Sequence, residues 1–275
     1  MSESAIAAAL AVARGQGVRC DEPVVLRDAW HVLVHLRPSP VVARVSSSIP
    51  FPEGPDPGGI ERELVVAAHA ARAGAPVIPP AEEVEQVPHR YRGHVVTFWR
   101  YVPPHAEADP RAAGRALRAV HDALADYDAD LPEPGHPEET LALLGALGAS
   151  AETEFLRGLV AASPKLLDGQ ALHGDAHLLN CLGSPGGPLW HDFETACSGP
   201  REYDLAALVA RHLALGDTPE AYEALSAYGA HDADVLDAML PLYVAWVTAS
   251  MMVASRRRPE LDEAVDVRLR WLRDR

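Results

Sequence analysis

The chain has 275 residues, 48% of them hydrophobic, and a formal net charge of −15. This length suffices for one large domain or for two smaller lobes, each with its own hydrophobic core. The acidic charge argues against a nucleic-acid partner, because non-specific binding to nucleic acid needs clustered Lys and Arg.

The N-terminal third predicts a helix followed by strands. Residues 1–17 are apolar but lack the basic start of a signal peptide, so we expect a helix there. A proline-rich loop at 49–59 precedes a predicted helix over 60–73, which Gly74 is expected to end. Runs rich in β-branched residues predict strands at 24–27, 30–36, 41–45 and 95–102.

Beyond residue 104 the pattern becomes helical. Three- and four-residue spacing of apolar side chains predicts helices at 109–125, 140–147 and 152–162, and again almost continuously from residue 203. Short strands interrupt this pattern between residues 171 and 194. Strands first and helices afterwards indicate an α+β fold, with residues 1–101 as one lobe and residues 102–275 as the other.

The sequence predicts a cytoplasmic protein without a membrane partner. Its three cysteines, Cys20, Cys181 and Cys197, form no CxxC pair and no even-numbered disulfide framework, which favours a reducing compartment. The uncharged stretch 239–254 is short for a membrane span and contains a proline, so we expect a buried helix.

Residues 172–194 carry the most informative chemistry. Asp175 and Asn180 lie five residues apart in one predicted loop, and Asp192 follows a Gly/Pro turn that would fold it back beside Asn180. Two carboxylates and an amide oxygen would then converge. Mg²⁺ takes such hard oxygen ligands and completes its coordination with phosphates and water.

Phosphoryl transfer needs this combination of groups. The metal neutralises phosphate charge, while a separate carboxylate accepts the proton of the attacking hydroxyl. The spacing His-x-Asp-x-x-x-x-Asn, followed by Asp-Phe-Glu, matches the order of a kinase catalytic loop and its metal-binding segment. Asp175 is the candidate base, and Asn180 and Asp192 are the candidate metal ligands.

The segments HGDAHLLN (173–180), DFE (192–194) and GPREYDLA (199–206) resemble the aminoglycoside phosphotransferase and choline kinase superfamily. The resemblance implies a two-lobed, protein-kinase-like fold, with a small antiparallel-sheet lobe and a larger helical lobe. It also implies a structural role for Asp204, which we expect to anchor the start of its helix.

The resemblance further implies a phosphate-binding cation on the third strand and a carboxylate on the next helix. Arg44 and Glu63 are the matching residues, and Glu63 shares a helix face with Val66 and Ala70 by its spacing. The alternative is a solvated arginine and an ordinary surface glutamate.

The connection between the lobes, which includes Trp99 and Tyr101, should pass the nucleobase. In kinase-like folds its backbone pairs with the base edge, and both side chains are equally good core residues. The loop that covers the nucleotide should lie near Trp30. It contains no Gly-x-Gly-x-x-Gly and departs from the kinase pattern there.

These features predict a small-molecule kinase that uses ATP or GTP with Mg²⁺ and transfers the terminal phosphoryl group to a hydroxyl. The acceptor pocket should lie in the helical lobe. One alternative is an impaired, kinase-like protein that only binds nucleotide. A more remote one is a metal-dependent hydrolase, suggested by His173, His177 and His191 around the two aspartates.

Overall fold

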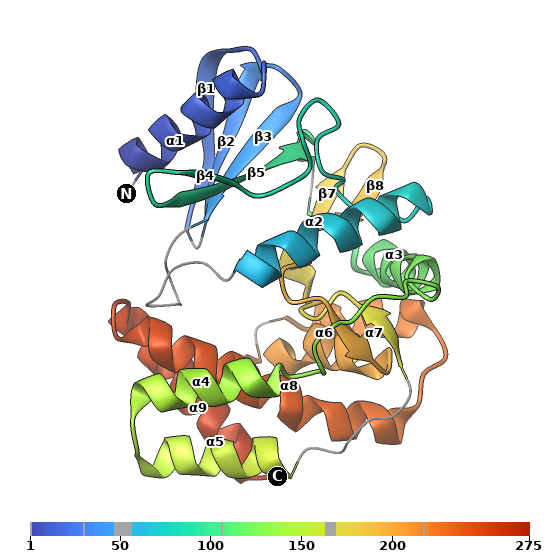
Figure 1. Ribbon diagram of the computed structural model, residues 1–275. Helices are drawn as coiled ribbons and strands as arrows, with labels where there is room; N and C mark the ends of the chain where they lie inside the picture. The colour runs from blue at the N-terminus through green and yellow to red at the C-terminus, as the bar shows by residue number, and fades with distance from the viewer. Residues whose placement is uncertain (1, 30, 47–56, 106, 163–168, 217) are drawn as a thin grey trace.

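The computed structural model describes residues 2–29, 31–46, 57–105, 107–162, 169–216 and 218–275. The chain forms a small lobe built on a sheet and a larger helical lobe below it (Figure 1). The α+β, two-lobed architecture expected from the sequence is therefore confirmed. The division between residues 101 and 102 stays a prediction.

The small lobe is a five-stranded antiparallel sheet in the order β1-β2-β3-β5-β4. Its central strand β3 is buried along its whole length because it pairs with β2 on one side and β5 on the other. Helix α1 covers one face through small alanines that pack on valines of the sheet. The elements are α1 (Ser2–Gly15), β1 (Cys20–Asp28), β2 (His31–Pro38), β3 (Val41–Ser46), β4 (His89–Tyr91) and β5 (His94–Arg100).

Helix α2 (Pro57–Arg72) lies between the sheet and the helical lobe (Figure 1). Its apolar face, which includes Val66 and Ala70, packs in one cluster with Leu117 of α3 (Pro110–Ala123) and Phe193. The helix ends at a left-handed Gly74 with φ of 82°, as the sequence predicts. The buried face of α2 thus belongs to the core of the helical lobe.

The helical lobe has a second core around α8 (Ala233–Ser255), whose buried side chains contact α4, α5, α6 and α9. Two short sheets, β6 with β9 and β7 with β8, lie between this core and the small lobe. The remaining elements are α4 (Pro137–Leu147), α5 (Ala151–Ala161), β6 (Gln170–Leu172), η1 (Leu178–Asn180), β7 (Cys181–Ser184), β8 (Gly187–Trp190), β9 (Cys197–Gly199), α6 (Glu202–Leu215), α7 (Glu220–Tyr228), η2 (Pro259–Leu261) and α9 (Asp262–Arg273).

Helix α8 is the one helix of the described residues that is long and apolar enough to cross a membrane. In the structure 61% of its most apolar window is buried against other parts of the protein. The expected buried helix is therefore observed, and it begins six residues before the uncharged stretch does.

Candidate functional site

The loop after β6 is built on a glycine. Gly174 has φ of 88°, a left-handed conformation that glycine adopts without strain. A Cβ at this position would lie 1.7 Å from the backbone oxygen of Thr195. The loop therefore passes directly against the segment after β8, and this close approach brings Asp175 towards that segment.

Asp204 holds the same loop in place through hydrogen bonds to two backbone amides. One of its carboxylate oxygens accepts a hydrogen bond from the His173 N–H and the other from the Gly174 N–H, each at 2.8 Å. His121 of α3 contacts it at 2.8 Å, and Asp204 is fully buried. The expectation that Asp204 anchors its own helix is wrong, because it lies inside the first turn of α6 and binds the loop's amides instead.

The carboxylate of Asp175 is held by three side chains. The Tyr243 hydroxyl donates to Oδ1 at 2.5 Å, while Asn180 Nδ2 and His177 Nε2 lie 3.3 and 3.4 Å from Oδ2. Burial opposes ionisation of this group. The contacts with His177 and Tyr243 outweigh burial and lower the pKa of Asp175 to about 2. Asp175 is thus ionised at neutral pH, as a proton acceptor must be.

The hairpin β7–β8 brings Asp192 beside the loop, as predicted. The His191 N–H donates to the Asn180 backbone oxygen at 3.0 Å and extends the pairing of the hairpin by one residue. Asp192 is the next residue along the chain and therefore lies close to Asn180. The side-chain amide nitrogen of Asn180 donates to the Asp175 backbone oxygen at 2.9 Å. The side-chain oxygen of Asn180 therefore remains available as a metal ligand.

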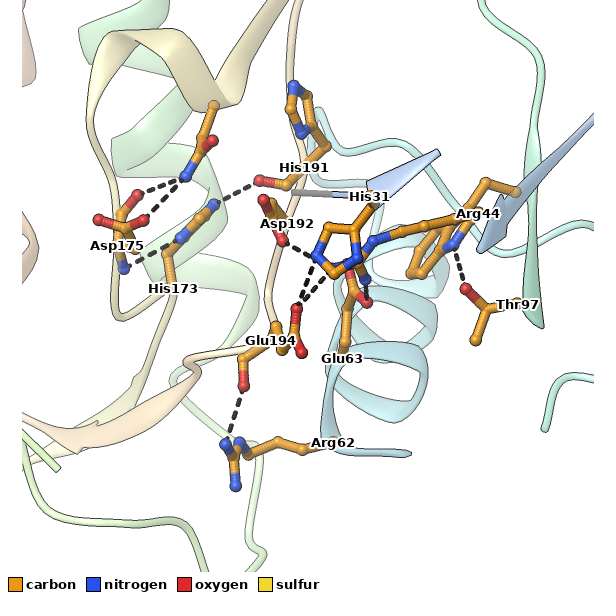
Figure 2. Close-up of polar contacts among 12 residues, drawn as sticks. His31, Arg44, Arg62, Glu63, Thr97, His173, Asp175, His191, Asp192 and Glu194 are labelled. Atoms are coloured by element: carbon orange, nitrogen blue, oxygen red, sulfur yellow. Dashed lines mark hydrogen bonds and ion pairs between the residues drawn. The ribbon is translucent and has the colours of Figure 1, made fainter. Parts of the chain in front are cut away.

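Arg44 is the centre of a second cluster. Its guanidinium binds Glu63 of α2, Glu194 at 2.5 Å and Asp192 at 3.3 Å (Figure 2). Arg44 is 5% exposed and Glu63 2% exposed, so the alternative of a solvated arginine and a surface glutamate is wrong. Burial disfavours the charged guanidinium, but the three carboxylates outweigh it and raise the pKa of Arg44.

Two residues complete this cluster. His31 Nε2 lies 2.6 Å from Arg44 Nη2 and 3.3 Å from Glu194 Oε2, so the imidazole contacts both members of this ion pair. Arg62 of α2 donates to the Glu194 backbone oxygen at 2.8 Å. The cluster therefore joins strands of the small lobe to the segment that follows β8.

The donor set fits a divalent cation. Three carboxyl groups, those of Glu63, Asp192 and Glu194, surround Arg44. Burial raises the pKa of Glu63, and the negative charges of Asp192 and Glu194 raise it further. Candidate ligand atoms of His31, Asp192 and Glu194 lie within 4.8 Å of one another. Asp192 is 38% exposed at its side chain, and carboxylate oxygens are the ligands that Mg²⁺ prefers.

The structure divides the predicted site residues into two groups. Arg44, Glu63 and Asp192 form one contact network, and Asp175 with Asn180 forms the other. Figure 2 shows His173 linking them: its Nδ1 accepts from the Asp175 N–H at 3.3 Å and its Nε2 donates to the His191 backbone oxygen at 2.9 Å.

Because both its ring nitrogens are used in this way, His173 has no lone pair for zinc. Among the residues that the structure describes, the one group of three candidate ligands is His31, Asp192 and Glu194, and it contains none of His173, His177 and His191. The geometry does not favour the hydrolase alternative.

The lobe connection packs inward. Trp99 is 8% exposed and its indole N–H donates to Thr97 Oγ1 at 2.9 Å, while the Tyr101 ring stacks on His35 with centroids 3.6 Å apart. The Tyr101 N–H donates to the Pro40 oxygen at 2.8 Å, so this amide is not available to a nucleobase. Trp30, the bulky residue of the expected nucleotide-covering loop, lies outside the described residues, as does most of the loop 49–59.

A sequence model described as the phosphotransferase enzyme family matches residues 11–242. The chain belongs to this family. No curated protein sequence matches the chain.

Solved structures similar to this phosphotransferase include small-molecule kinases and an aminoglycoside-bound phosphotransferase. The amicoumacin kinase hAmiN, in complex with AMP-PNP, Ca²⁺ and Ami, has a TM-score of 0.71 and 13% identity over 100% of this chain and 96% of its own. Choline kinase LicA from Streptococcus pneumoniae has a TM-score of 0.69 and 13% identity over 97% and 99%. The GDP and kanamycin complex of APH(2")-IIia has a TM-score of 0.62 and 14% identity over 96% and 97%. At these identities the likeness shows the fold.

Several site residues of this phosphotransferase could not be found from the motifs. Tyr243 lies in an apolar helix, and its contact with Asp175 spans 68 positions, so spacing gives no signal. His31 is the first residue of β2 and follows a segment without a glycine motif. Glu194 had a signal, because it follows Asp192 by two residues in the position where kinases have glycine.

Proposed function

We propose that this phosphotransferase transfers the terminal phosphoryl group of ATP or GTP to a hydroxyl of a small molecule. The observation that supports this most is the cluster around Arg44, in which a buried guanidinium from the small lobe is held by carboxylates beside the Asp175 loop. Similar structures bind AMP-PNP or GDP together with small-molecule substrates, which fits a nucleotide donor here.

The chain's own residues divide the chemistry between them. Arg44 would bind the nucleotide phosphates, with Glu63 orienting its guanidinium. Asp175 would hydrogen-bond the acceptor hydroxyl and take its proton as the acceptor oxygen bonds to the terminal phosphorus. The bond from that phosphorus to the bridging oxygen breaks, and the nucleoside diphosphate leaves.

A divalent ion, which we propose to be Mg²⁺, would be held by Asn180 and Asp192 and would neutralise charge on the phosphates. Glu194 is a further carboxylate within reach of the same place. The backbone of the lobe connection around Trp99 and Tyr101 stays our proposal for the nucleobase contact, through groups other than the Tyr101 N–H.

The test is a panel of hydroxyl compounds scored for ADP or GDP release, with and without Mg²⁺, for the parent and Asp175→Asn. We expect Asp175→Asn to lose turnover by a factor on the order of 10² or more, while it still binds Mg²⁺ and nucleotide in calorimetry. Equal turnover of parent and variant would refute the assignment of the base. Binding of nucleotide without transfer to any acceptor would favour the non-catalytic alternative.

A further inference from the structure

The two oxygens of the Asp175 carboxylate are not equivalent. Oδ1 accepts a 2.5 Å hydrogen bond from the Tyr243 hydroxyl, whereas the contacts of Oδ2 with Asn180 and His177 are 3.3 and 3.4 Å long. Typical N–H···O distances are about 2.9–3.0 Å, so both contacts of Oδ2 are longer than an ordinary hydrogen bond. Oδ1 is therefore committed to the protein, and Oδ2 is the oxygen that a further donor can bind well.

The group that holds Oδ1 is itself held rigidly. Tyr243 is 5% exposed in the middle of α8, where its ring contacts Tyr203 at 5.8 Å and Trp246 at 5.9 Å between centroids. Burial raises the pKa of Tyr243 well above its ordinary value, so the group remains a phenol and donates its hydrogen. A buried phenol on a packed helix can therefore hold the carboxylate that it binds in one orientation.

We infer that Tyr243 is a positioning residue of the transfer reaction, which binds Oδ1 of Asp175 and thereby turns Oδ2 towards the acceptor hydroxyl. This inference rests on the proposed function, because it takes Asp175 as the base. It adds that α8, a helix with no motif of its own, orients the proton acceptor.

The arrangement has a chemical purpose. A free carboxylate rotates about its Cα–Cβ and Cβ–Cγ bonds, and each rotation moves the proton acceptor away from the attacking oxygen. Fixing one oxygen by a charge-assisted hydrogen bond removes this freedom before the acceptor arrives. The loss of that bond should lower turnover without changing how the nucleotide binds.

Tyr243→Phe tests this inference, since it removes one hydroxyl and keeps the ring. We expect kcat to fall by about 10- to 100-fold, the effect of one charge-assisted hydrogen bond, with the nucleotide KM unchanged. The matched control is Thr248→Val. It removes another buried hydroxyl from the same helix, one that donates to the Val244 backbone oxygen at 2.6 Å, and it should keep the parent kcat.

Adding Tyr243→Phe to Asp175→Asn separates positioning from loss of structure. If the tyrosine acts through Asp175, the second substitution lowers nucleotide turnover no further, whether the assay uses an acceptor from the panel or water. A parent kcat in Tyr243→Phe would overturn the inference, as would a raised kcat, which would mean that the phenol competes with the acceptor. If Asp175→Asn turns over nucleotide as fast as the parent, the proposed function itself fails. That result is distinct from a failure of the inference, because it does not involve Tyr243.

Discussion

At the scale of single residues, the site consists of ionisable groups whose charge is set by a few close neighbours. Asp175 and Arg44 are each buried and each remain charged, because opposite charges or donors lie within hydrogen-bonding distance. The sequence predicted these two residues and their partners Asn180 and Glu63, since each pair lies within a motif or at a recognisable spacing. His31 and Tyr243 were not predicted, because their contacts depend on how distant elements pack.

The lowered pKa of Asp175 predicts a dependence of stability on pH. Its folded-state pKa of about 2 lies below the ordinary aspartate value of 3.8, so its ionised form stabilises the folded state above about pH 4, and this contribution disappears as the pH falls towards 2. The full contribution is about 2 kcal/mol, of which about half should be lost by about pH 3.

Urea unfolding of parent and Asp175→Asn at about pH 5 and about pH 3 measures this contribution, because the other carboxylates titrate in both proteins. The difference between the two free energies of unfolding should shrink at the lower pH. A constant difference would show that the pKa of Asp175 is not lowered.

At the scale of elements, Asp204 ties three of them together. Its helix α6 holds the loop after β6 through two backbone amides, and His121 of α3 binds both Asp204 and the Tyr228 hydroxyl of α7. The sequence identified Asp204 as structural but not its partners, because a helix-start pattern describes only local hydrogen bonds.

The helices and most strands were predictable from periodicity. The three-residue strands β4 and β9 were not, since they are too short to show a pattern.

Removal of the Asp204 carboxylate should destabilise the protein severely. Asp204→Ala leaves two buried N–H groups and His121 without their acceptor, and we expect the free energy of unfolding to fall by about 3–5 kcal/mol. Asp122→Asn is the control, because Asp122 pairs with Arg201 at 2.9 Å on the surface and should cost less than about 1 kcal/mol. Equal effects of the two substitutions in denaturant unfolding would contradict this role of Asp204.

At the scale of the whole molecule, the candidate ligands of nucleotide and metal come from both lobes. Strands of the small lobe provide Arg44 and His31, and the segment after β8 provides Asp192 and Glu194. The sequence predicted the two lobes and the order of their elements. It did not predict that His31 and Glu194 would meet at Arg44, because that contact requires the relative placement of the lobes.

Mg²⁺ and nucleotide together should therefore stabilise the protein against heat. At a ligand concentration about 100 times Kd, the stabilisation is about 2.7 kcal/mol, which corresponds to a rise in Tm of roughly 5–10 °C. Thermal unfolding with Mg²⁺–ATP, Mg²⁺–GTP, or either nucleotide in chelator measures this effect. Asp192→Asn should lose most of the rise, and a full rise in this variant would exclude Asp192 as a metal ligand.

The buried face of helix α2 has a consequence for how the two lobes are held together. Ala43 and Val45 of β3 belong to the core of the sheet, whereas Leu64 and Val66, beside Glu63, belong to the core of the helical lobe. The bond between Arg44 and Glu63 thus spans two hydrophobic cores, and all three carboxylates around Arg44 lie on the lower one. A phosphate bound to this guanidinium would compete with those carboxylates, so we expect nucleotide binding to be thermodynamically linked to the attraction between the two cores.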